Sequence, residues 1–340
     1  MKTCLKAISA FICSFFLVNF LCMFYYSGPG DLYRDHGATG SIRMPDSRYV
    51  NAAEGFAVVH FDRNGYNNMD GKLEKPYVLI MGSSHMEATY VWQEQNTASI
   101  LNDLLGGTDT DLRTYNIAHA NTPLPDIIKG FQAGIGEFPD SCAVVIEIYD
   151  TSFSVSDLQD ALQQTSYNVD SSGAYLSRHL TDGQKLRSSL IGCMPFAKYV
   201  LNRQLGNFSG SKDPVSGSQT GFEANDYKTA LNAAFSLIRN EYTDPIIVLY
   251  HPEVDFCKNN MTIVRDEDSY DIFKGVCEDN GMIFVDTGDA FMRAFEDHLV
   301  VPYGFQNTAI GDGHLNADGH RIVARELYQV LKDLPGVTWE

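Results

Sequence analysis

Two short motifs, far apart in the chain, carry residue types that could perform nucleophilic catalysis. The first is the Gly-Ser-Ser turn at 82–84, which directly follows the apolar run 77–81. An apolar strand that leads into a small-residue turn and then a helix is how α/β folds present a nucleophilic hydroxyl. Serine needs a base to become a good nucleophile, and the candidate base is His314 in the second motif, 311–316.

Together the two motifs predict an acyl-transfer site. His314 would take the proton of the Ser84 hydroxyl as its oxygen attacks an ester carbonyl, and would then return that proton to the leaving alcohol. Asp312 would hold the imidazole in the required tautomer and stabilise its charged form. The alternative for Asp312 is a turn-forming role before the last helix, which is common for Asp. The pairing of the two motifs and their order along the chain favour the catalytic interpretation.

The elements that must position these residues follow an alternation of apolar strands and helical patterns. Strands are expected at 77–81, 113–118, 143–149, 245–250 and 282–286. Helices are expected at 86–105, 124–136, 224–241, 266–280, 288–297 and 316–332. Asn316 or Asp318 could cap the last helix. This alternation predicts an α/β fold in which helices cover both faces of a mainly parallel five-stranded sheet.

We expect three parts along the chain: a signal-anchor or transmembrane segment at 1–30, an extended and partly β lead-in at 31–75, and an α/β domain at 76–335. An insertion at about 150–225 interrupts the alternation, and its Gly- and Ser-rich part, 206–221, is typical of a loop. Insertions between strand ends and helices lie over the active face of such sheets, so a lid or substrate surface is expected there.

The first segment differs in character from the rest. Lys2 and Lys6 precede an uncharged stretch, 7–26, whose length suits one membrane span. Basic residues on its short N-terminal side favour leaving that end in the cytoplasm, which places the working part outside. A cleaved signal peptide is the alternative, but no clean small-x-small cleavage site follows the apolar stretch.

The amino-acid composition limits the classes of partner that the protein can bind. The chain has 340 residues, of which 44% are hydrophobic and 20% charged, and these are values of a globular protein. A net charge of −18 argues against nucleic acid as a partner, because phosphate binding needs clustered Lys and Arg. No CxxC motif or Cys/His cluster indicates structural zinc, and no cofactor is expected.

Four cysteines lie beyond the apolar segment, at positions 142, 193, 257 and 277. In an exported domain an even number permits disulfides. A bond between Cys257 and Cys277, which flank one expected helix, is the favoured pairing. Separate buried thiols are the alternative.

The arrangement over residues 76–332 resembles the SGNH/GDSL hydrolase superfamily, whose fold is a flavodoxin-like α/β/α sandwich. The turn 82–84 is similar to the family's GDS-type turn, with Ser83 in place of Asp, and the resemblance implies Ser84 as the nucleophile. Asp312 and His314 fill the family's last block. Their one-residue spacing is similar to the exported polysaccharide O-acetyltransferase and esterase branch, the alginate-acetylation proteins among them.

The resemblance is incomplete at the oxyanion hole. The family draws donors from the nucleophile's N–H, a Gly after the second strand and an Asn after the third, and this chain lacks that Gly and that Asn. The candidate oxyanion and substrate-binding residues are Gly82, Ala120, Asn121, Thr151 and His251, with Tyr149 as a further substitute donor. Losing one donor typically costs about 2.7–4 kcal/mol of transition-state stabilisation.

Three functions are compatible with these residues. The first is a serine esterase outside the cytoplasm that removes O-acyl groups, acetyl among them, from a cell-surface or extracellular glycan. The second is a polysaccharide O-acetyltransferase that uses the same residues, with a sugar hydroxyl in place of water. The third is a glycan-binding or assembly protein whose site is degenerate. The expected partners are an acylated carbohydrate or other ester and, through the first segment, a membrane.

Overall fold

The computed structural model describes residues 2–22, 24, 33–36, 40–43, 45–69, 73, 76–106, 112–163, 194, 196 and 223–334. Its centre is a five-stranded sheet with the strand order β11-β8-β7-β5-β6, and all neighbouring strands run parallel. The strands are β5 (Tyr77–Met81), β6 (Arg113–Asn116), β7 (Ser141–Ile148), β8 (Ile246–Tyr250) and β11 (Ile283–Asp286). Each overlaps one of the five expected strands, and the order is that of a flavodoxin-like fold.

The central strands are buried on both faces. In β5, Val78 and Ile80 pack into one layer, while Leu79 and Met81 pack into the opposite layer. Successive side chains of a strand point to opposite faces, so an uninterrupted apolar run requires cover on both sides. This is why the run at 77–81 forms the middle of the sheet.

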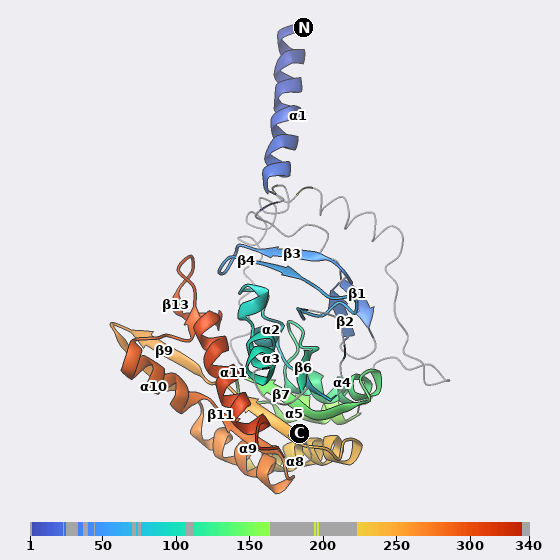
Figure 1. Ribbon diagram of the computed structural model, residues 1–340, viewed down its shortest axis with the longest axis vertical. Coiled ribbons are helices and arrows are strands. Elements are labelled where there is room, and N and C mark those ends of the chain that lie inside the picture. The colour runs from blue at the N-terminus through green and yellow to red at the C-terminus, as the bar shows by residue number, and fades with distance from the viewer. Residues whose placement is uncertain are drawn as a thin grey trace.

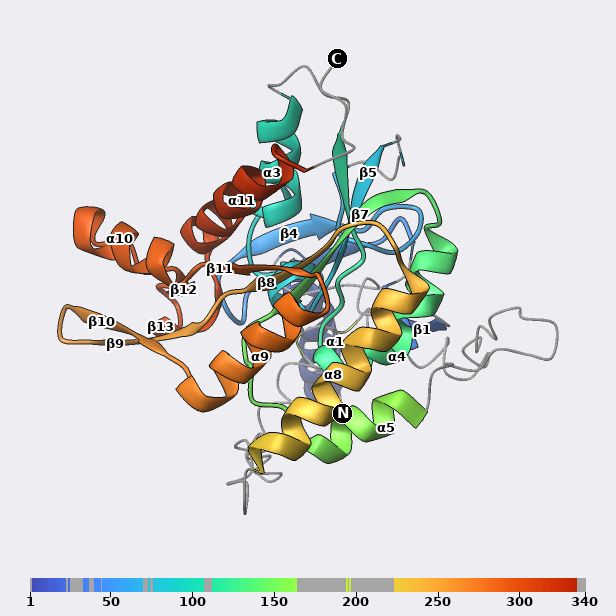
Figure 2. The ribbon, with the colours of Figure 1, turned by 90° about the horizontal axis from the view of Figure 1, so that it is seen from below.

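Two layers of helices supply that cover (Figure 2). One layer contains α4 (Leu124–Glu137), α5 (Val155–Gln163), α8 (Ala224–Glu241) and α9 (Glu267–Asp279). The other contains α3 (Thr97–Gly106), α10 (Gly288–His298) and α11 (Ala317–Leu331). The fold is therefore the expected three-layer α/β/α sandwich. The Asn316 side chain caps α11 by accepting the N–H groups of Asp318 and Gly319.

The prediction of a single helix at 86–105 is wrong. The segment is divided into α2 (Ser84–Glu87), a 3₁₀ turn η2 (Gln93–Gln95) and α3. Ala88 has left-handed backbone angles, which end α2, and the Asn96 side chain accepts the Ser99 N–H at 2.7 Å, which starts α3 anew. The intervening loop carries Tyr90 to the nucleophile's side of the molecule.

The described part of the chain also forms four two-stranded hairpins around the sheet. The lead-in contains β1 (Tyr33–His36) paired with β2 (Gly40–Arg43), and β3 (Arg48–Asn51) paired with β4 (Ala57–His60). Two further hairpins were not expected from the sequence: β9 (Glu253–Cys257) with β10 (Asn260–Val264), and β12 (Tyr303–Gly304) with β13 (Ile310–Leu315).

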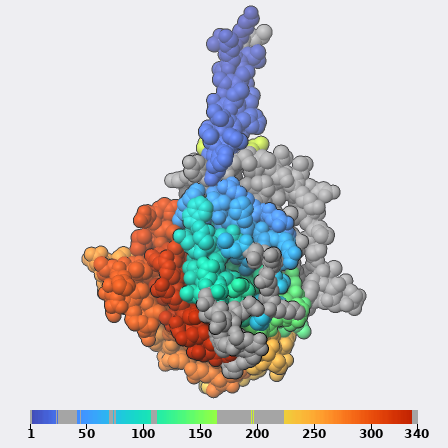
Figure 3. Space-filling model, in the orientation of Figure 1, coloured from blue at the N-terminus to red at the C-terminus, as the bar shows by residue number. Residues whose placement is uncertain are grey.

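A buried ion pair fixes the lead-in to the helix that follows the nucleophile turn. The Arg43 guanidinium contacts both carboxylate oxygens of Glu87, at 2.8 and 3.2 Å, and both side chains are buried. The Asn67 side chain donates to the backbone carbonyl of Glu87 at 2.7 Å. In the space-filling view the blue residues of the lead-in lie directly against the cyan residues of α2 and α3 (Figure 3). The lead-in is thus part of the site's scaffold.

The first helix, α1 (Lys2–Cys22), extends away from the α/β domain (Figure 1). It has 21 residues with a mean hydropathy of 2.0 over its most apolar window, of which 6% is buried. Its length and composition suit a membrane span, and a signal sequence has the same properties.

Two further sequence expectations concern regions beyond the sheet. Cys257 is exposed on β9 and Cys277 is buried in α9, and both are free thiols, so the favoured disulfide between them is wrong. Helix α5 lies at the start of the expected insertion, and the loop expected at 206–221 lies outside the described residues.

Candidate active site

The structure places Ser84 beside His314. Strand β5 ends at Met81, the chain turns through Gly82 and Ser83, and Ser84 is the first residue of α2. The Ser84 Oγ atom lies 2.9 Å from His314 Nε2, within hydrogen-bond distance although the residues are 230 positions apart. Ser83 is buried and faces the sheet. The hydroxyl that meets the imidazole is therefore the one expected.

His314 reaches this place from β13, just before α11. Its second ring nitrogen, Nδ1, lies 2.7 Å from the Glu54 Oε2 atom, and its backbone N–H donates to Glu54 Oε1 at 2.7 Å. The imidazole and the carboxylate are 21% and 18% exposed, so neither is closed off from a substrate. Ser84, His314 and Glu54 thus form a continuous hydroxyl–imidazole–carboxylate chain.

The carboxylate in this chain differs from the one expected. Asp312 is exposed, and its Oδ1 atom accepts the N–H of the adjacent Gly313 at 2.8 Å. Gly311 and Gly313 have φ values of 87° and 85°, which break the regular alternation of β13. In an unbroken strand residues two apart share a face, and here that relation between Asp312 and His314 is lost. The structure therefore corrects the expected Asp312–His314 contact to Glu54–His314.

Glu54 is delivered by the turn between β3 and β4. Asn307 holds that turn: its Oδ1 accepts the Gly55 N–H at 2.8 Å, and its Nδ2 donates to the Gly55 carbonyl at 2.9 Å. A side chain at Gly313 would collide with the Glu54 carboxylate, so glycine is required there on both steric and backbone grounds. The lead-in is joined to the last motif of the chain through these contacts.

The sequence signal for Glu54 is weak. It is the acidic residue in the segment 51–56, Asn-Ala-Ala-Glu-Gly-Phe, which joins two short strands. An acidic residue in such a turn is usually exposed to solvent and has no catalytic role. Burial raises the pKa of the Glu54 carboxyl, but hydrogen bonds from the side chain and backbone of His314 outweigh this effect and lower it. The carboxylate form is thus favoured beside the imidazole.

Two rings hold the His314 imidazole from its sides. The Tyr90 ring stacks on it with a centroid distance of 3.7 Å and an interplanar angle of 16°. The His85 ring lies 4.9 Å away, and its Nδ1 atom accepts the Leu315 N–H at 3.3 Å. Burial, with smaller effects from the neighbouring His251, His314 and His320, keeps the pKa of His85 well below its ordinary value. His85 is therefore a neutral packing partner.

The backbone N–H of Ser84 is a candidate oxyanion donor. At the start of α2, the Ser83 N–H donates to Glu147, the His85 N–H to Ser83 Oγ and the Met86 N–H to the Ser83 carbonyl. Among the described residues the Ser84 N–H has no such partner, as expected for the first turn of a helix. It is a donor available to a developing negative charge next to Ser84 Oγ.

The remaining oxyanion candidates fall into two groups. Ala120 and Asn121 lie at the surface in the loop after β6, where Asn121 adopts a positive φ of 60°, and Gly82 packs against the Glu147 side chain. Thr151 is buried, with its Oγ1 3.1 Å from Ser269 Oγ, and His251 is fully buried. The expectation that Thr151 and His251 contact a substrate is therefore wrong, because neither has exposed surface to offer.

Asn116 is a structural link at the same edge of the sheet. Its Nδ2 donates to the Met86 carbonyl at 2.7 Å, and its Oδ1 accepts the Ala118 N–H at 3.0 Å. The end of β6 is thereby joined to helix α2.

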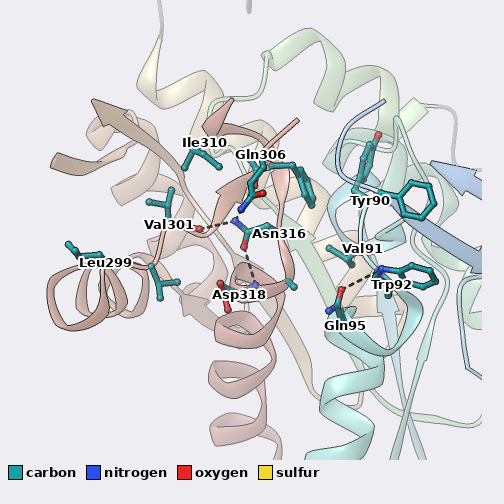
Figure 4. Close-up of a pocket in the computed structure, with 15 residues that line it drawn as sticks. Tyr90, Val91, Trp92, Gln95, Leu299, Val301, Gln306, Ile310, Asn316 and Asp318 are labelled. Carbon is teal, nitrogen blue, oxygen red and sulfur yellow. Dashed lines mark hydrogen bonds between the residues drawn. The ribbon is translucent and has the colours of Figure 1, made fainter. Parts of the chain in front are cut away.

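A groove of about 780 Å³ lies between the loop that carries Tyr90 and the loop before α11 (Figure 4), and neither Ser84 nor His314 is among its lining residues. Tyr90, whose ring stacks on His314, forms part of its wall, together with Trp92 and Phe56. Phe56 is 44% and Trp92 40% exposed, and their rings meet edge to face at 6.0 Å. The opposite wall comes from the loop before α11, including Gln306 and Ile310.

No family model and no curated protein matches the chain. Solved structures with a similar arrangement include LAE5, an alpha/beta hydrolase enzyme from the metagenome of Lake Arreo. Its sequence identity to this chain is 14% and the TM-score is 0.43, and the alignment covers 77% of this chain and 97% of LAE5. The psychrotrophic esterase EstA from Pseudoalteromonas has 12% identity and a TM-score of 0.40, with 76% and 97% covered. Axe2, an acetylxylan esterase from Geobacillus stearothermophilus, has 13% identity and a TM-score of 0.41, with 78% and 96% covered. The geometry of Ser84, His314 and Glu54 carries the functional assignment.

Proposed function

We propose that the protein is a serine-dependent esterase in which Ser84 is the nucleophile, His314 the general acid and base, and Glu54 the carboxylate that orients His314. The observation that carries this proposal is the continuous chain of contacts, 2.9 Å from Ser84 Oγ to His314 Nε2 and 2.7 Å from His314 Nδ1 to Glu54 Oε2. A serine hydroxyl, an imidazole and a carboxylate in this order form a catalytic triad on unrelated folds.

The contacts support a separate role for each group. With a hydrogen on Nδ1 donated to Glu54, the Nε2 atom of His314 has a free electron pair to accept the Ser84 proton as Oγ attacks the ester carbonyl. The imidazolium that forms is stabilised by the Glu54 carboxylate. The Ser84 N–H would donate to the developing oxyanion, and donors in the loop containing Ala120 and Asn121 would complete the oxyanion hole. His314 then protonates the leaving alcohol.

The groove beside the site supports an acylated glycan as the substrate. Exposed aromatic faces provide flat apolar surface for the C–H faces of a sugar ring, and a volume of about 780 Å³ falls within the usual range for ligand sites. Phe56 and Trp92 supply such faces in a wall that begins at Tyr90, which contacts His314. Tyr90 connects the groove to His314, so a polysaccharide chain lying in the groove would extend an O-acyl group past Tyr90 toward Ser84.

The first helix supports a location at a membrane. Helix α1 is long and apolar enough to span one, and the basic residues Lys2 and Lys6 at its start favour a cytoplasmic N-terminus. In that orientation the α/β domain acts outside the cytoplasm, where cell-surface and extracellular glycans are found.

The test uses an activated acetyl ester with the wild-type protein and the Ser84→Ala variant. Ser84→Ala is expected to abolish turnover while leaving the melting temperature nearly unchanged, because Ser84 is only half-buried and its hydroxyl bonds to the partly exposed His314. Ser156→Ala is the control for removing a serine hydroxyl, since Ser156 is exposed on α5 and lies outside the site. Equal turnover in wild type and Ser84→Ala would contradict the proposal and favour a glycan-binding protein with a degenerate site.

Transfer to a sugar is the competing outcome of the same chemistry. The groove could hold an acceptor whose hydroxyl, instead of water, attacks the acyl-enzyme. Adding an oligosaccharide to the ester assay separates the two. Free acetate as the main product supports the esterase, whereas acetylated sugar as the main product identifies an O-acetyltransferase. Trp92→Ala should raise KM for an acetylated oligosaccharide and leave KM for a small ester unchanged.

A further inference from the structure

A buried glutamate–histidine pair lies directly beneath the turn that precedes Ser84. Glu147, near the end of β7, and His251, just after β8, are both fully buried, and Glu147 Oε1 lies 2.5 Å from His251 Nε2. Burying a carboxylate is costly unless it is paired and hydrogen-bonded. The proposed reaction does not use these two side chains, so their burial at the catalytic edge of the sheet needs another explanation.

The hydrogen bonds around His251 fix where its protons lie. The Tyr303 hydroxyl is 2.8 Å from the His251 carbonyl, 2.9 Å from the Pro252 carbonyl and 2.7 Å from His251 Nδ1. Carbonyl oxygens only accept, so the Tyr303 O–H donates to them and its oxygen accepts a hydrogen from Nδ1. A 2.5 Å contact between Nε2 and Glu147 Oε1 then requires one further proton, shared between the two. The pair therefore carries no net charge.

The second oxygen of Glu147 holds the nucleophile turn. Glu147 Oε2 accepts the backbone N–H of Ser83 at 2.6 Å, and Oε1 accepts the Ser83 hydroxyl at 3.2 Å. The packing at this point is tight, because a Cβ atom at Gly82 would lie 2.5 Å from Glu147 Oε2. The contacts fix the peptide unit that immediately precedes Ser84.

We propose that Glu147, His251 and Tyr303 form a positioning network that sets the direction in which Ser84 presents its hydroxyl to His314. The inference rests on the proposed function, since it assigns the network to that reaction. Its three members come from the ends of β7 and β8 and from β12. The position of the turn at Ser83 is therefore set by the positions of these strand ends. A misplacement of the attacking atom by about 1 Å can cost about 100-fold in rate.

The network makes a specific demand on the side chain at position 147. It must accept the Ser83 N–H with one atom and present a hydrogen to His251 Nε2 with the other. The amide of Gln meets both demands, because its oxygen accepts and its NH₂ group donates. Ala meets neither. Glu147→Gln should therefore keep the turn in place, whereas Glu147→Ala should release it.

The experiment measures kcat and KM for an activated acetyl ester with Glu147→Ala, Glu147→Gln and Ser141→Ala. The last is the matched control, since Ser141 is buried in the same strand at its opposite end and contacts the Tyr242 hydroxyl at 3.2 Å. Glu147→Ala is expected to lower kcat by about 10- to 100-fold with KM within about twofold. Glu147→Gln should restore most of kcat, and Ser141→Ala should leave both constants unchanged.

Tyr303→Phe keeps the test decisive if Glu147→Ala does not fold, because it removes only a hydroxyl. It is expected to lower kcat about three- to tenfold at unchanged KM, since loss of the contacts that this hydroxyl makes with His251 and Pro252 loosens the network without deleting it. Wild-type kcat in a folded Glu147→Ala or in Tyr303→Phe would overturn the inference, as would a Gln variant no better than Ala. An inactive wild type would instead count against the proposed function itself.

Discussion

Glu54 and His314 are joined by two hydrogen bonds across 260 positions of the chain. One oxygen of the carboxylate accepts the backbone N–H of His314 and the other faces its Nδ1 atom, each at 2.7 Å. A carboxylate held at both oxygens has little freedom to rotate, so the imidazole is fixed in one orientation and one tautomer. The lead-in thereby becomes a component of the site.

The first prediction compares the two acidic residues that could serve His314. Glu54→Gln should lower kcat for an activated acetyl ester by about 10²- to 10⁴-fold, because loss of the triad carboxylate leaves the imidazole without charge stabilisation. Asp312→Asn should change kcat by less than about twofold, since its carboxylate is exposed and contacts Gly313. Steady-state kinetics on both variants checks this.

Circular dichroism and melting temperature control for folding in that comparison. A folded Glu54→Gln with wild-type kcat, together with an inactive Asp312→Asn, would restore Asp312 to the orienting role. Both substitutions replace a carboxylate by an amide. A difference in kcat between the two variants therefore reflects where the carboxylate lies and not the loss of a charge as such.

The sheet could be predicted from the sequence because each strand is an apolar run of its own. The run at 77–81 is buried along its whole length, and the runs that form β6, β7, β8 and β11 pair beside it in the order typical of the fold. Ser84 and His314 could be predicted for a related reason, since the turn after the first strand and the segment before the last helix meet at the same edge of such a sheet.

Glu54 could not be predicted in this way. Its contact with His314 depends on the packing of an irregular lead-in against the domain, which no local periodicity encodes. The resemblance to the SGNH/GDSL superfamily places Asp312 with His314 in the last block before the final helix, but the positive φ angles of Gly311 and Gly313 turn the backbone away from strand geometry. His251 was expected to meet substrate because it ends a strand, and only the structure shows Glu147 pairing with it below the surface.

The second prediction concerns acid stability and His320. This residue is fully buried with its Nδ1 atom 2.8 Å from Thr97 Oγ1, and burial, with smaller effects from His251 and His314, lowers its pKa to about 3. Between its ordinary pKa of about 6.5 and this value, the unfolded chain binds a proton that the folded chain does not. Stability therefore falls as the pH drops through that window.

His320→Gln should remove this part of the pH dependence. Its unfolding free energy will be lower than that of the wild type at pH 7.5, but the difference between the two proteins should shrink by about 2 kcal/mol at pH 5. Urea unfolding at the two pH values measures the change. A difference that stays constant with pH would show that His320 titrates alike in the folded and unfolded states.

The third prediction concerns the buried pair that fixes the lead-in. Arg43→Met leaves the Glu87 carboxylate buried without its partner and should lower the unfolding free energy by about 3–5 kcal/mol. The double variant Arg43→Met, Glu87→Leu should recover part of that loss, because it removes both charges. A double-mutant cycle in urea isolates the coupling between them. Strictly additive losses would show that the two side chains do not stabilise each other.

The last prediction tests the ring that stacks on His314. Tyr90→Ala should lower kcat for a small acetyl ester about three- to tenfold, because loss of a face-to-face contact worth about 0.5–1.5 kcal/mol lets the imidazole leave its productive orientation. Burial raises the pKa of the Tyr90 phenol, so the hydroxyl stays neutral and the stacking face is the relevant group. Tyr90→Phe keeps that face and should retain kcat within about twofold. If Phe lost as much activity as Ala, the hydroxyl and not the stacked ring would be the group that matters.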